Sequence, residues 1–166
     1  MAITKKKNSK HIETMSYFSE TLPVNNYKKL NFKSGVYLYN FPVKLKPVLA
    51  EAARKALSNL KPGVINIILV NDASIKKLNK KYRKVDRITD VISFLSNSRP
   101  LFGDIYISRE RSRKQAKRYG NLWQEELAYL VIHGILHLFG YKDYAPADRK
   151  KMFKKQDSIF KAIKKC

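Results

Sequence analysis

Residues 122–143 read LWQEELAYLVIHGILHLFGYKD and contain two of the three histidines of the chain. Apolar residues recur on most sides of the span 122–139, so we predict a helix that is buried at the centre of the fold and ends at Gly140. His133 and His137 are four residues apart, and their imidazoles therefore leave the same face of this helix about one turn apart.

Two neighbouring histidines on an apolar helix are costly to bury unless both are hydrogen-bonded or share a metal ion. Asp143, six residues after His137, adds a carboxylate just beyond the glycine turn. Two imidazoles and one carboxylate can hold a single Zn²⁺ and leave one coordination position open, although iron and nickel also accept this set. A closed structural site would need a fourth protein ligand. We therefore predict an open metal site at His133, His137 and Asp143, with hydrogen-bonded structural histidines as the alternative.

The residue between the two histidines bears on the chemistry of such a site. Metalloproteases have the signature His-Glu-x-x-His, in which the glutamate is the general base, and Gly134 occupies that position here. A zinc peptidase would thus lack its base in the usual place, although a minimal peptidase remains an alternative. We also expect the glycine to leave room above the metal for a bulky substrate.

The charge of the chain points to a polyanionic partner. Lysine and arginine number 35 against 13 aspartates and glutamates, which gives a formal net charge of +22. Such a field attracts polyanions, and nucleic acid is the expected partner, with a merely solvated basic surface as the alternative. The basic residues cluster in three spans, namely Lys76–Arg87, Arg109–Arg118 and Arg149–Lys165.

The length of 166 residues favours one domain with its own core. We expect residues 1–34, which are polar, basic and without a sustained period, to form a flexible extension, and residues 35–166 to form the domain. No apolar run approaches the ~18 residues of a membrane span, and the N-terminus lacks the pattern of a secretory signal. The single cysteine, Cys166, cannot form an internal disulfide, so a cytoplasmic location fits. The sequence leaves the oligomeric state open.

The remaining pattern alternates short β-favouring runs with helical spacing, which predicts a single α+β domain. We expect a small mixed β-sheet packed with helices around the central metal-binding helix. The run 64–70 is almost continuously aliphatic and should be a central strand. Asn71 and Asn121 should cap the helices that follow them. The expected strands are 36–39, 64–70, 89–94 and 102–108, and the expected helices are 43–60, 73–83, 109–119, 122–139 and 146–164.

The span His133–Asp143 resembles the signature His-Gly-x-Leu-His-Leu-x-Gly-Tyr-x-His of the YbeY-type endoribonucleases, which are rRNA maturation factors. Three further segments resemble the same family in the same order, and together the resemblance covers about residues 36–163. These segments are Asn79-x-x-Tyr82-Arg83, Thr89–Phe94 and Gly103-Asp104-Ile105.

The resemblance implies a zinc-dependent endoribonuclease that acts on single-stranded RNA, in 16S rRNA 3′-end maturation and ribosome quality control. Its partners would be rRNA and the small ribosomal subunit. It implies one Zn²⁺ held by His133, His137 and Asp143, with aspartate where the family has a third histidine. It also places an important arginine at Arg83, so Arg83 and His133 are the candidate catalytic residues. A non-catalytic ribosome-assembly factor stabilised by the metal is the alternative from another functional class.

Overall fold

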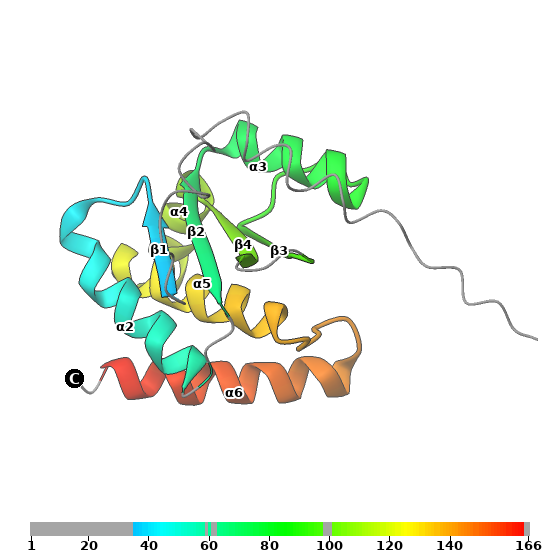
Figure 1. The fold of residues 1–166 in the computed structure, drawn as a ribbon. Helices are drawn as coiled ribbons and strands as arrows, with labels where there is room; N and C mark the ends of the chain where they lie inside the picture. Colours follow the sequence, from blue (N-terminus) through cyan, green and yellow to red (C-terminus); the bar gives the residue numbers. More distant parts are fainter. Residues whose placement is uncertain (1–34, 59, 61–62, 98–100, 165–166) are drawn as a thin grey trace, which may run out of the picture.

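The structure is a computed structural model that describes residues 35–58, 60, 63–97 and 101–164 (Figure 1). The expected flexible extension at residues 1–34 lies outside the described residues and stays a prediction. Within the described part, no helix has the length and apolar character needed to cross a membrane.

Four strands form one mixed sheet in the order β1-β2-β4-β3, which confirms the expected α+β class (Figure 1). β1 (Gly35–Tyr39) and β4 (Leu101–Ser108) both pair in parallel with β2 (Val64–Val70), and β3 (Val91–Leu95) pairs antiparallel with β4. β2 therefore lies inside the sheet, as its continuous aliphatic run predicts, and six of its seven residues are buried.

Helices cover the two faces of the sheet unequally. α2 (Lys46–Leu57), preceded by a 3-10 turn at Val43–Leu45, packs with α5 (Trp123–Leu138) on one face, and α6 (Pro146–Lys164) packs against both helices on the side away from the sheet (Figure 1). α3 (Asp72–Leu78) covers part of the other face, and α4 (Arg109–Tyr119) flanks α5. The histidine helix α5 is thus the buried central helix, as predicted.

Gly134 lets α5 approach the sheet closely. A Cβ added at this position would lie 2.6 Å from the Ile105 Cγ2 atom of β4. The Ser93 hydroxyl of β3 also donates a hydrogen bond to the Gly134 carbonyl, with 3.1 Å between the oxygens. The glycine therefore faces the sheet, and the expectation that it leaves room above the metal is wrong.

Two expected helix ends differ in the structure, and a residue with a positive φ follows each of them. The helix expected over 43–60 ends at Leu57, because Ser58 has a positive φ of 53°. The helix expected over 73–83 stops being α-helical after Leu78 and continues as a π-helical turn over Asn79–Arg83, which ends at Lys84 in the left-handed conformation.

Two capping predictions have different outcomes. Asn71 caps α3 as expected, because its side-chain oxygen accepts a hydrogen bond from the Ser74 amide at 2.8 Å. At the start of α5, however, Leu122 is the N-cap residue, and the Glu125 carboxylate accepts the Leu122 amide at 2.9 Å. The prediction of an Asn121 cap is therefore wrong, and an acidic side chain of the first turn takes that role.

Candidate metal centre

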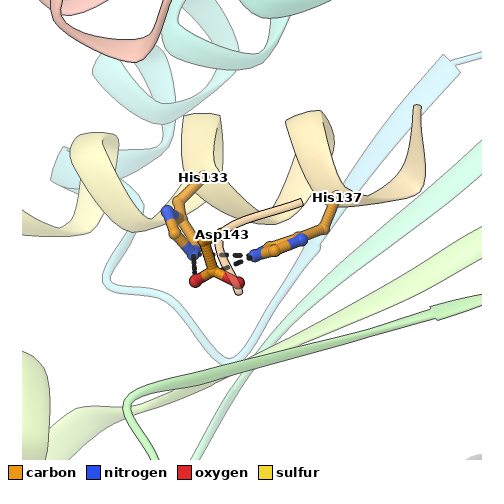
Figure 2. A group of neighbouring side chains, drawn as sticks. All are labelled: His133, His137 and Asp143. Atoms are coloured by element: carbon orange, nitrogen blue, oxygen red, sulfur yellow. Dashed lines mark hydrogen bonds and ion pairs between the residues drawn. The ribbon is translucent and has the colours of Figure 1, made fainter. Parts of the chain in front are cut away.

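His133 and His137 project from one face of α5 toward the Asp143 carboxylate, which the chain brings back after the Gly140 turn (Figure 2). The two histidine Nε2 atoms are 2.9 Å apart, and Asp143 Oδ2 lies 4.0 Å from the first and 3.8 Å from the second. One ligand atom from each of the three residues lies within 4.8 Å of the others. The structure thus brings the three predicted ligands together in one place.

Hydrogen bonds fix which nitrogen of His137 can bind a metal. The Nδ1 atom of His137 lies 3.0 Å from the Tyr141 carbonyl, which can only accept, so Nδ1 carries the proton. Burial and then the neighbouring His133 lower the pKa of His137, while the Asp143 carboxylate opposes the change. The neutral imidazole therefore presents an unprotonated Nε2 toward His133.

His133 is oriented in the same way by a buried amide. Its Nδ1 atom lies 3.0 Å from Gln156 Oε1, and the Nε2 group of that glutamine donates to the Tyr129 carbonyl at 3.2 Å. The second bond fixes the orientation of the amide, so its oxygen faces His133 and accepts the Nδ1 proton. Nε2 is consequently the His133 nitrogen that faces the site.

The donor set therefore fits a bound cation. The Nε2 atoms of the two imidazoles lie 2.9 Å apart beside a carboxylate, so either a proton on one nitrogen or a shared cation must bridge them. Imidazole nitrogens with one carboxylate oxygen are typical zinc ligands. Hydrogen bonds from the other ring nitrogen to a carbonyl or amide are also the usual support of metal-binding histidines.

The loop that carries Asp143 is tied to both flanking helices. Gly140 ends α5 with a φ of 83°, and the Tyr141 amide donates to the Leu136 carbonyl at 3.1 Å. Arg149, in the first turns of α6, donates its Nε hydrogen to the Asp143 carbonyl at 2.9 Å. These contacts hold the backbone of residue 143 in place, whatever side chain it carries.

A pocket of about 400 Å³ opens around the three ligands and contains two guanidinium groups. Arg83 reaches it from the end of the π-helical turn, and Arg149 reaches it from α6. Asn79 anchors the segment after the π-helical turn, since its buried side chain donates to the Arg87 carbonyl at 2.8 Å. The lining residues are Arg83, Thr89, Asp90, Val91, Ser93, His133, His137, Asp143, Tyr144 and Arg149.

The other polar residues at the strand ends have structural partners. Asp90 Oδ1 accepts the Val91 amide at 2.8 Å, and its Oδ2 accepts Gln115 Nε2 at 2.8 Å. Thr89 donates to Asp90 at 3.2 Å or to the Val91 carbonyl at 3.3 Å. These residues shape the pocket wall, and Asp90 has little acceptor capacity left for a substrate.

Sequence reasoning missed Gln156 and treated Arg149 only as part of a basic span. Gln156 is fully buried between Met152 and Ile159 on α6. A glutamine in the middle of an apolar stripe is the signal that could have identified it, because buried polar groups have hydrogen-bond partners. The Tyr141 carbonyl has no such signal, since any residue could supply it.

Comparison with known proteins identifies the family of this fold and site. The family model described as Endoribonuclease YbeY matches residues 39–164. The endoribonuclease YbeY of Endomicrobium trichonymphae is 56% identical over 126 residues, which cover 75% of this chain and 89% of that protein. The endoribonuclease YbeY of Desulfitobacterium hafniense is 36% identical over 82% of this chain and 97% of its own length.

A solved structure agrees with these sequence matches. The solution structure of a Thermotoga maritima protein covers 77% of this chain and 88% of its own, with 31% identity and a TM-score of 0.54. The resemblance predicted from the histidine helix and its companion segments is thereby confirmed, and the chain belongs to the endoribonuclease YbeY family.

Proposed function

We propose that this endoribonuclease cuts single-stranded RNA with one Zn²⁺ held by His133, His137 and Asp143. The observation that carries the proposal is the convergence of two imidazole nitrogens and a carboxylate in a pocket that Arg83 and Arg149 also line. Cationic groups beside an open metal site suit a phosphodiester, which carries a negative charge in the ground state and more in the transition state.

Each side chain has a distinct part in this chemistry. A bound divalent ion supplies Lewis-acid activation of the phosphodiester. Arg83 holds a phosphoryl oxygen through its guanidinium and offsets the charge that develops during cleavage. Arg149 fixes the Asp143 backbone and adds positive charge to the same pocket wall. Asp143 contributes a negative charge that a histidine would lack, which makes a bound ion a weaker Lewis acid.

The structure argues against a peptidase at this site. Gly134, which stands where a zinc peptidase has its glutamate, faces the sheet rather than the pocket. Asp90 is the other carboxylate that lines the metal pocket, and its oxygens already accept hydrogen bonds from Val91 and Gln115. Asp90 is thus held by the protein itself, and no glutamate lines this pocket to replace the one that Gly134 lacks.

We propose further that the substrate is rRNA, at the 16S 3′ end and during ribosome quality control in the cytoplasm. The basic residues support this partner, because the clusters of α4, α6 and the span 76–87 flank the pocket helices with exposed lysines and arginines. Phosphate contacts of this kind make binding fall steeply with salt. Association with the small ribosomal subunit would use the same basic surfaces.

The test is cleavage of a single-stranded RNA that contains the 16S 3′ end, together with metal analysis of the purified protein. We expect bound zinc in the wild type, and loss of both zinc and cleavage in His137→Ala. Asp148→Asn, on the exposed first turn of α6, is the matched control and should retain both. A folded His133→Ala protein that cleaves as fast as the wild type would overturn the proposal. Binding of rRNA without any cleavage by the wild type would favour an assembly factor.

A further inference from the structure

A second pocket lies beside the metal pocket, between α4, α5 and α6. It has a volume of about 550 Å³, and we call it the side pocket. Asp90 and His133 line both pockets, so the two pockets are adjacent. An RNA chain bound at the metal ligands would therefore have its neighbouring nucleotides close to the side pocket. The side pocket is lined by Asp90, Gln115, Tyr119, Asn121, Glu126, Tyr129, Leu130, His133, Phe153, Asp157 and Phe160.

The two pockets differ in charge. In the metal pocket, Arg83 and Arg149 balance the carboxylates of Asp90 and Asp143. The lining of the side pocket has three carboxylates and no lysine or arginine, in a chain that has only 13 acidic residues and a net charge of +22. A phosphate therefore favours the first pocket over the second. The side pocket thus suits a neutral part of an RNA chain that carries hydrogen-bond donors.

Two exposed aromatic rings belong to the side pocket. Phe153 on α6 is 38% exposed and Tyr119 on α4 is 62% exposed, so both rings are accessible to a ligand in the side pocket. The Phe153 ring centroid lies 6.4 Å from that of His133, so one ring joins the side pocket to the metal ligands. The Arg118 guanidinium lies 5.8 Å from the Tyr119 ring centroid. Aromatic and guanidinium planes of this kind stack on unpaired bases.

Glu126 gives the side pocket an acceptor with spare capacity. Its side chain is 4% exposed, and its carboxylate receives the Asn121 amide at 3.5 Å, the long limit of a hydrogen bond. A buried carboxylate has about four acceptor positions and is costly to leave unmatched. A second metal ion does not fit, because His133, His137 and Asp143 form the one group of potential metal ligands that converges within the described residues.

We propose that the side pocket holds the nucleobase of a nucleotide next to the scissile phosphate, which rests on the proposed endoribonuclease function. The base stacks on Phe153 and Tyr119, and its amino group donates to Glu126. Guanine, adenine and cytosine carry such an amino group. Uracil has no amino group, and its one ring donor on this edge, N3–H, lies between two carbonyl oxygens that a carboxylate repels. The side pocket therefore disfavours uracil at this one position of the RNA.

The test uses the zinc-loaded protein and nuclease-resistant 2′-O-methyl phosphorothioate oligonucleotides, so that binding is read without cleavage. One position at a time carries guanine, cytosine, uracil or no base. We expect one position at which the abasic form binds about 5- to 100-fold more weakly than the guanine form. The oligonucleotide with uracil at the same position should bind more weakly than the guanine form by a comparable factor. Equal affinity for all forms at every position would overturn the proposal, whether or not the protein cleaves RNA.

Variants assign the preference to the side pocket. Phe153→Leu should remove most of the difference in affinity between the guanine and abasic oligonucleotides, and Phe153→Trp should retain that difference. Glu126→Gln should reduce the discrimination against uracil, while Asp148→Asn, outside both pockets, should leave it unchanged. Zinc content should stay constant in all four variants. A discrimination that survives both Phe153→Leu and Glu126→Gln would place the base elsewhere and reject the side pocket, even if cleavage of RNA is confirmed.

Discussion

Gln156 accepts a hydrogen bond from the Nδ1–H group of His133 at 3.0 Å, from a position on α6 that is fully buried. The same amide donates to the Tyr129 carbonyl on α5 at 3.2 Å, so one side chain couples the packing of α6 on α5 to the orientation of a metal ligand. A helix that contributes no metal ligand therefore determines which nitrogen of His133 faces the site.

Removal of this amide should weaken metal binding. In Gln156→Leu the His133 ring loses its acceptor, and we expect zinc affinity to fall by about 10- to 100-fold, as for other residues that support metal ligands. The unfolding free energy should also fall by about 1–3 kcal/mol, because the Tyr129 carbonyl loses its buried donor. Competition with a chromophoric chelator measures the affinity. Gln156→Glu keeps an acceptor for His133, so an equal loss of zinc in both variants would contradict the orienting role.

Much of this site was predictable from sequence, because its metal ligands lie close together along the chain. His133, His137 and Gly140 belong to one helix and its end, so helical geometry alone places them together. Asp143 is close enough in sequence for the same argument. Gln156 is 23 residues from His133 and reaches it through helix packing, which no local pattern encodes.

In the fold, too, features set by the local sequence pattern were predictable, and features set by packing were not. Periodicity predicts the strand Val64–Val70 and the helix Pro146–Lys164, because burial follows the apolar pattern. It does not predict the π-helical turn at Asn79–Arg83, nor the bond from the Asn79 side chain to the Arg87 carbonyl that follows it. The role of Gly134 was also missed, since the contact with Ile105 exists only after α5 has packed on the sheet.

Gly134→Ala should destabilise the protein without removing its metal ligands. Alanine favours a helix over glycine by about 1 kcal/mol, but the new Cβ would lie 2.6 Å from Ile105 Cγ2 on an inner strand. Overpacking of this kind costs about 1–3 kcal/mol, so we expect a net decrease in unfolding free energy. Urea denaturation measures it. When Ile105→Ala is also present, Gly134→Ala should cost less unfolding free energy, because the shorter side chain leaves room for the new Cβ. If the effects of the two substitutions are additive, Ile105 does not clash directly with that Cβ.

The buried pair of Asn66 and Asp104 should make stability depend on pH. Burial raises the pKa of Asp104 to about 6, although the Asn66 amide donates to its carboxylate at 2.9 Å. A carboxyl group with a raised pKa in the folded state stabilises it most when protonated. This contribution is complete below the unfolded pKa of 3.8 and is lost as the pH rises through about 6.

Asp104→Asn removes that titration and provides the test. We expect the variant to be more stable than the wild type above pH 7, by up to about 3 kcal/mol, and the difference to shrink toward pH 4. Urea unfolding at several pH values measures both proteins. The other carboxyl groups titrate in the wild type and in the variant alike. The difference between the two unfolding free energies therefore isolates residue 104. A difference that does not change with pH would show that Asp104 titrates normally.

Arg83 should contribute to cleavage and not to metal retention. Arg83→Gln removes the guanidinium from the pocket wall, and we expect the kcat for RNA cleavage to fall by about 10²- to 10³-fold, as when one donor to a transition-state oxygen is lost. Arg83→Lys keeps the charge but not the two-pronged donor geometry and should recover only part of the rate. Zinc content should match the wild type in both. Arg87→Gln, a basic residue outside both pockets, is the matched control.

Asp143→His would restore the third histidine that is usual in the family. The backbone contacts of residue 143 do not depend on its side chain, so the substitution should leave them intact. Arg149 holds the carbonyl of residue 143 rather than its side chain, so the loop should keep its path. We expect the variant to retain zinc and to cleave RNA at least as fast as the wild type, because a neutral ligand leaves the bound ion a stronger Lewis acid. Asp143→Ala should lose most of its zinc. If the histidine variant loses zinc as fully as the alanine variant, the aspartate is required by the geometry of this loop and not only as a third donor.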